Sequence, residues 1–137
     1  KDSVTGGAGV DTYNLAATAA ARGTKAKHLV ITDFTKGDKI DFTGISQGTV
    51  ANATLGAAVT LSSGSEETLD NYLAAASTQN GSGNSVVTHF QFGGNTYLFL
   101  DRANANYADG TDSFIELTGL VTLKGSAITA GEILTLA

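Results

Sequence analysis

The sequence of 137 residues lacks cysteine, proline, methionine and tryptophan altogether. The absence of cysteine rules out disulfides, so the chain comes either from the cytosol or from a secreted protein that is stabilised in another way. Because the sequence opens at Lys1 and not at a methionine, we expect it to be part of a longer protein. No apolar run is long enough to span a membrane, and no signal peptide opens the chain.

Basic residues are also scarce, since 8 Lys and Arg face 13 Asp and Glu, which gives a formal net charge of −5. A nucleic-acid-binding domain needs a basic surface that displaces counterions from phosphates, so we expect no nucleic acid partner. An acidic surface is compatible with divalent cations. At this length we expect one domain, covering residues 1–137.

Clusters of β-branched and aromatic residues predict a mainly β fold. We expect strands at residues 28–34, 39–45, 85–92, 96–101, 112–120 and 132–136. The glycine-rich residues 93–95 between two of these strands predict a tight hairpin. Residues 46–64 are weakly patterned and are predicted as a loop or an edge strand.

One amphipathic helix is predicted within residues 62–80. Its apolar residues recur at helical spacing and form one stripe, which consists of Leu69, Tyr72, Leu73 and Ala76. Ser63 and Glu66 have the spacing of a capping box, and Ser65 is an alternative N-cap. The alanine-rich residues 14–23 allow a second helix, although their periodicity is poor.

Glycines concentrate in the segment TGGAGVDTYN, residues 5–14. Residues 6–14 match the nonapeptide G-G-x-G-x-D-x-U-x, in which U is a large apolar residue, at every fixed position. The matching residues are Gly6, Gly7, Gly9, Asp11 and Tyr13. The preceding residues KDSVT match the end of the same unit, because Asp2 stands nine positions before Asp11.

Such a loop suits calcium, which takes six to eight oxygen ligands. Glycines let the main chain turn its carbonyls toward an ion, and an aspartate adds a negative charge. The expected ligands are the side chains of Asp2 and Asp11 and the carbonyls of Gly6, Gly7, Ala8 and Gly9. Two other interpretations remain open, namely a turn that holds no ion and a phosphate-binding loop, although the order G-x-G-x-x-G is not met.

The segment HLVITDFTKGDKIDFTGI, residues 28–45, resembles the region that follows the last nonapeptide in RTX proteins exported by type I secretion. Serralysin-type metalloproteases carry a similar pattern, roughly [I/V]-x-D-F-x-x-G-x-D-x-I-D-[L/F]-[S/T]-G-[I/L], with some length variation after the first glycine. The matching residues are Asp33, Phe34, Gly37, Asp38, Ile40, Asp41, Phe42, Thr43, Gly44 and Ile45. The resemblance implies that this segment caps the last calcium loop, with Asp33 as a further ligand.

Residues 89–123 are similar to the C-terminal ends of RTX surface-layer proteins of Gram-negative bacteria. This resemblance implies a short calcium-binding parallel β-roll at residues 1–14, which runs into a β-sandwich-like region at residues 15–137 with one amphipathic helix. It also implies a non-enzymatic, secreted domain that serves type I export and folds at the cell surface, where calcium is plentiful. The implied partners are calcium, copies of the same protein in a surface lattice and the secretion machinery.

Other acidic residues have simpler interpretations. Asp38 and Asp41 are expected in a turn and at a strand edge. Asp101, Asp109 and Asp112 stay open as metal ligands, although a plain Asp-Gly turn is favoured at residues 109–110.

The two histidines, His28 and His89, are expected on strands, facing water, rather than as catalytic bases. H-E-x-x-H does not occur, so the metalloprotease motif is missing from these residues, and we expect no enzyme. A small basic cluster before the first predicted strand is expected to face solvent, and it consists of Arg22, Lys25, Lys27 and His28. The aromatic residues of the hairpin are expected in the core, and these are Phe90, Phe92, Tyr97 and Phe99.

Two functions of other classes remain open beside the surface-layer interpretation. One is an ancillary calcium-binding domain of a secreted serralysin-like metalloprotease. The other is an adhesin module, which requires a shaped pocket for its ligand.

Overall fold

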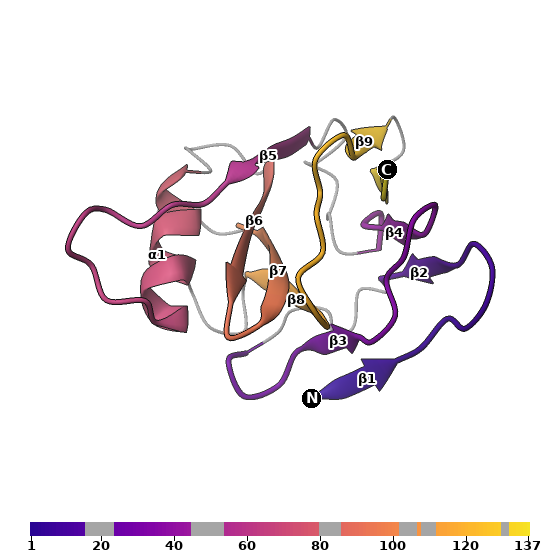
Figure 1. Ribbon diagram of the computed structural model, residues 1–137, viewed down its shortest axis with the longest axis horizontal. Coiled ribbons are helices and arrows are strands. Elements are labelled where there is room, and N and C mark those ends of the chain that lie inside the picture. The colour runs from indigo at the N-terminus through magenta and orange to yellow at the C-terminus, as the bar shows by residue number, and fades with distance from the viewer. Residues whose placement is uncertain (16–23, 45–53, 80–85, 102–106, 108–111, 130–131) are drawn as a thin grey trace.

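The computed structural model describes residues 1–15, 24–44, 54–79, 86–101, 107, 112–129 and 132–137. Within these residues the chain is mainly β, with two sheets and one helix (Figure 1). The predicted mainly β fold with a single amphipathic helix is therefore confirmed for the described part of the chain.

The larger sheet contains six strands in the order β1-β3-β8-β7-β6-β5. Their bounds, in that order, are Asp2–Val4, Leu29–Ile31, Ser113–Leu117, Asn95–Leu100, Val86–Phe92 and Thr54–Ala58. Strands β1, β3 and β8 run parallel to one another, and β5 runs parallel to β6. Strand β7 runs antiparallel to both of its neighbours, β6 and β8.

The smaller sheet contains four short strands in the order β2-β4-β10-β9. Their bounds, in that order, are Thr12–Asn14, Lys39–Asp41, Ile133–Thr135 and Ala127–Thr129. Strand β2 runs parallel to β4, whereas β10 runs antiparallel to β4 and β9. The amino-terminal strands β1 and β2 thus form one edge of each sheet.

Two hydrophobic cores lie on opposite faces of the larger sheet. The first joins both sheets, because Ile40 and Leu134 of the smaller sheet pack with Ile31 and Ile115 of the larger one. The second packs helix α1 (Leu69–Gln79) through residues such as Leu73. Figure 1 accordingly shows α1 on the left, β6–β8 in the middle and the smaller sheet on the right. All five residues of β8 are buried as a result.

Each of the six segments predicted as strands overlaps a strand of the structure. These strands are β3, β4, β6, β7, β8 and β10. The hairpin is confirmed too, since β6 and β7 meet at Gly93 and Gly94, whose φ angles of 58° and 83° suit a primed two-residue turn. Strand β5 lies at a sheet edge within the segment predicted as a loop or edge strand. Strand β9 is not among the predicted strands, and residues 16–23 of the possible second helix lie outside the described residues.

The predicted N-caps of the helix, Ser63 and Ser65, are wrong. The helix begins at Leu69, and the Thr68 hydroxyl accepts a hydrogen bond from the Asn71 amide at 3.2 Å. This contact is the N-cap arrangement, in which a side-chain oxygen satisfies a free amide of the first turn. The serines belong to a preceding turn, where the Ser65 amide donates to the Ser62 carbonyl.

Candidate metal-binding loop

Two turns of chain that cross from the larger sheet to the smaller one lie side by side. The first turn consists of β1, residues 5–11 and β2, and the second consists of β3, residues 32–38 and β4 (Figure 1). Both pairs of strands are parallel, and each residue of the first turn lies beside the residue 27 positions later. The glycine-rich loop 5–11 is therefore neighbour to loop 32–38, which carries Asp33 and Asp38.

The carboxylate of Asp33 lies against the main chain of the glycine-rich loop. Its Oδ1 accepts from the Gly6 amide at 2.9 Å, and its Oδ2 accepts from the Gly7 amide at 2.7 Å. The Tyr13 hydroxyl donates to Oδ1 at 2.8 Å. These hydrogen bonds, those from Gly6 and Gly7 first, lower the pKa of Asp33.

Asp38 makes the second junction between the two loops. Its Oδ1 accepts from the Asp11 amide at 2.9 Å, and its Oδ2 accepts from the amide and the hydroxyl of Thr35 at 2.7 and 3.1 Å. Asp38 is 1% exposed, so its buried carboxylate is satisfied by these hydrogen bonds. The predicted turn at Asp38 is confirmed.

The carboxylate of Asp11 has a different position. It lies over Gly6, where an added Cβ would stand 2.6 Å from both Cγ and Oδ2 of Asp11 and 2.7 Å from the Tyr13 hydroxyl oxygen. A glycine at position 6 is thus required by this close approach. Among the described residues, no group donates a hydrogen bond to the half-buried Asp11 carboxylate.

The oxygen atoms of loop 5–11 provide some, but not all, of the ligands that calcium needs. Among the described residues, no main-chain donor reaches the carbonyls of residues 6–9, which all lie in an exposed stretch. Gly7 and Gly9 have φ angles of 96° and 117°, a conformation that other residues rarely adopt. With Asp11, the loop offers one carboxylate and four carbonyls, so further oxygens are needed to reach the six to eight that calcium takes.

The other expected ligands do not join this loop as metal ligands in the structure. Asp33 is nearby, but both of its oxygens face hydrogen-bond donors. Asp2 lies at the start of β1, where its amide donates to the His28 carbonyl, at the end of the strand away from the loop. No three His, Asp or Glu side chains converge into a possible metal site within the described ranges.

The prediction that His28 faces water is wrong. His28 is 2% exposed, because its ring packs on Phe114 with the two ring centroids 4.7 Å apart. Its Nε2 lies 2.7 Å from Oε2 of Glu116, which also pairs with Lys1. The sequence gives no local signal for this contact, since His28 and Glu116 are 88 positions apart.

In the basic cluster, Lys25 and Lys27 are exposed as expected, and Arg22 lies outside the described residues.

Two further aspartates are buried at the end of the β7–β8 hairpin. Asp101 directly follows Leu100, and Asp112 directly precedes Ser113, the residue that pairs with Leu100. Both aspartates are at most 2% exposed. Asp109 lies outside the described residues. The described part of this hairpin end therefore holds two buried carboxylates.

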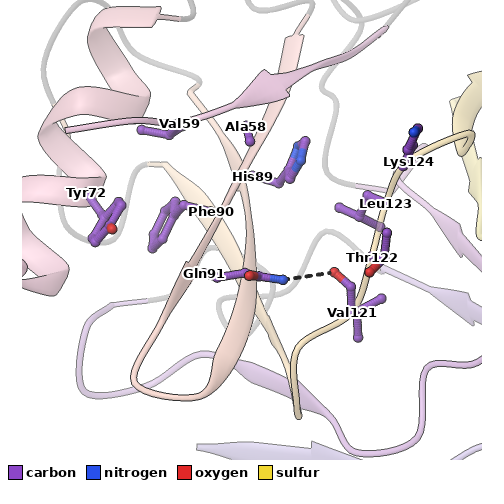
Figure 2. A pocket seen from close by; sticks show the side chains of 10 residues that line it. All are labelled: Ala58, Val59, Tyr72, His89, Phe90, Gln91, Val121, Thr122, Leu123 and Lys124. Atoms are coloured by element: carbon purple, nitrogen blue, oxygen red, sulfur yellow. Dashed lines mark hydrogen bonds between the residues drawn. The ribbon is translucent and has the colours of Figure 1, made fainter.

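A cavity of about 480 Å³ lies between β5, β6 and residues 121–124 (Figure 2). The half-buried His89 lines it, and burial lowers the pKa of His89, with a partial offset from the Gly56 carbonyl. Gln91 donates to the Val121 carbonyl at 3.4 Å across one side. Among the described residues that line the cavity, Lys124 is charged and none is a carboxylate, so these residues offer no acidic ligand to a divalent cation.

In the parts of the chain that the structure describes, no helix combines the length and the apolar character needed to cross a membrane. Comparison with known proteins finds no family whose model matches the chain and no curated protein that matches it.

Proposed function

We propose that the chain is a non-catalytic, calcium-stabilised domain of a secreted RTX-type surface protein, in which loop 5–11 holds the ion. One observation carries the proposal. The nonapeptide loop joins two parallel-paired strands, and within the described residues its Asp11 carboxylate and its residue 6–9 carbonyls accept no hydrogen bond from the protein. Oxygen atoms that lack a partner at an exposed, glycine-rich turn are the kind of ligands that calcium takes.

In this proposal Asp11 and the carbonyls of residues 6–9 hold the ion, with the remaining oxygens from water or from another loop. Calcium supplies charge neutralisation and binds the folded turn only, so it stabilises the fold by mass action. The chain would thus be less stable at the low calcium concentration of a cytosol and more stable outside the cell. This difference suits export in an unfolded state followed by folding at the cell surface.

The two sheet edges formed by β1 and β2 support the part of the proposal that concerns assembly. Both strands are short and lie at the same end of the molecule, where the described residues leave one side of each strand unpaired. Unpaired strand edges are templates for further pairing. A neighbouring turn or a second copy of the chain in a surface lattice is the proposed occupant of these edges.

Calcium titration of the 137-residue chain tests the proposal, with β-structure followed by circular dichroism and size by analytical ultracentrifugation. We expect chelator to lower the melting temperature, calcium to restore it, and magnesium to have little effect because it demands a tighter octahedral geometry. Asp11→Ala should weaken the calcium response, whereas Glu67→Ala, at an exposed site outside the loop, should not. A melting temperature that ignores calcium and chelator alike would refute the proposal.

A further inference from the structure

Hydrogen bonds join loop 5–11 to loop 32–38 at both ends. The Thr5 and Thr32 hydroxyls lie 2.6 Å apart, and Asp33 accepts from the amides of Gly6 and Gly7. At the far end of the loop, Asp38 accepts from the Asp11 amide. Each contact joins residues 26 or 27 positions apart, so they follow the register of the paired strands.

We propose that the Asp33 carboxylate caps this junction in the place where a metal ion would otherwise join two loops, so that calcium on loop 5–11 takes no ligand from residues 32–38. The part of this inference that concerns calcium rests on the proposed function. The cap itself does not, because it is argued from the hydrogen bonds that Asp33 accepts from Gly6, Gly7 and Tyr13.

The direction of the donors is the first argument. Two successive main-chain amides and one hydroxyl point their hydrogens at the Asp33 carboxylate, which is an arrangement that binds an anion. A cation at the same oxygens would face those three hydrogens at close range.

The composition of loop 32–38 is the second argument. Its other carboxylate, Asp38, is buried and already accepts hydrogen bonds from three donors. The exposed Lys36 stands 27 positions after Gly9 and brings a positive charge to the second loop. Loop 32–38 therefore offers an ion only carboxylates that already accept hydrogen bonds from the protein.

The test compares Asp33→Asn, Asp11→Asn and wild type in the full 137-residue chain. Amide exchange of Gly6 and Gly7 is followed by NMR in chelator, and the calcium dissociation constant is measured by calorimetry. An asparagine keeps one acceptor oxygen but turns an NH₂ group toward the other amide. Glu67→Gln changes the charge by the same amount at an exposed site outside both loops and is the matched control.

We expect Gly6 and Gly7 to be protected in wild type without calcium, and Asp33→Asn to speed their exchange about tenfold or more. The calcium dissociation constant of Asp33→Asn should stay within about fivefold of wild type, whereas Asp11→Asn should raise it beyond that limit while the two amides stay protected. A dissociation constant raised more than about fivefold by Asp33→Asn, or amides protected only after calcium is added, would overturn the cap.

A second variant keeps the test decisive should Asp33→Asn fail to fold. Tyr13→Phe removes one of the three donors to Asp33 and leaves both amide contacts in place. We expect slightly faster exchange at Gly6 in chelator and an unchanged calcium dissociation constant. A wild-type chain that binds no calcium but protects both amides would refute the proposed function and leave the cap standing, so the two failures are distinguishable.

Discussion

The Nε2 atom of His28 lies 2.7 Å from Oε2 of Glu116, in the middle of the larger sheet. The other ring nitrogen, Nδ1, lies 3.3 Å from the Thr24 carbonyl, so both nitrogens face acceptors. Because Lys1 also pairs with Glu116, this buried carboxylate connects the start of the chain with strand β8.

Glu116→Gln should lower the free energy of unfolding by about 2 kcal/mol, because it removes the charge of a buried carboxylate that accepts from Lys1 and lies 2.7 Å from Nε2 of His28. Chemical denaturation of wild type and variant measures this difference. The exposed pair of Lys25 and Asp70 gives the control, and Asp70→Asn should cost no more than about 1 kcal/mol. Equal losses in the two variants would contradict the assigned role of the buried cluster.

The same carboxylate predicts a pH dependence. Burial raises the pKa of Glu116, but hydrogen bonds from His28 and Lys1 outweigh burial and bring the pKa below its ordinary value of 4.5. A lowered pKa in the folded state means that the contribution of Glu116 is complete above 4.5 and is lost as the pH falls below it. The groups that face Glu116 are Lys1, His28, Asn95 and Tyr97.

Melting temperatures measured at pH values on both sides of 4.5 check this dependence. We expect the difference between wild type and Glu116→Gln to shrink as the pH falls, since the protonated carboxyl group resembles the amide. A difference that is constant over the whole acid range would show that the charge of Glu116 does not contribute.

Gly6→Ala should destabilise the chain by about 1–3 kcal/mol, since the added Cβ would stand 2.6 Å from the Asp11 carboxylate carbon. The displaced Asp11 side chain should also weaken the calcium response. Thermal unfolding with and without calcium measures both effects, and Ala8→Ser, at an exposed position of the same loop, is the control. A Gly6→Ala variant as stable as Ala8→Ser would mean that Asp11 does not lie over Gly6.

Thr68→Ala should cost about 1 kcal/mol, because it removes the oxygen that accepts from the Asn71 amide at the first turn of the helix. Ser65→Ala should leave the stability unchanged, since Ser65 lies before the helix. Urea denaturation of the two variants distinguishes these positions. The reverse order of effects would restore Ser65 as the N-cap.

Local patterns in the sequence predicted much of the fold. The apolar stripe around Leu73 identified the helix, and the two glycines at 93–94 identified the hairpin. Both features depend on neighbours within a few residues, which a sequence displays directly. The start of the helix was misplaced because Ser63, Ser65 and Thr68 are all good N-caps, and only the contact with the Asn71 amide distinguishes them.

The candidate site was predicted less completely. The nonapeptide pattern identified Gly6 and Asp11 as parts of one tight loop, and the structure brings these two residues together. Asp33 was expected beside this loop and lies there, but its carboxylate faces amide hydrogens. A motif defines which residue types are near one another, and it does not define which way a main-chain N–H points.

The sequence by itself determined a β-rich chain with one amphipathic helix and one glycine-rich acidic loop, because these follow from side-chain spacing and from the freedom of glycine. Only the tertiary structure decided that loop 5–11 lies beside loop 32–38, and that His28 is buried against Glu116. Those contacts depend on the register of parallel strands that are far apart in the chain. Register is set by how two sheets and a helix share their cores, and no local propensity encodes it.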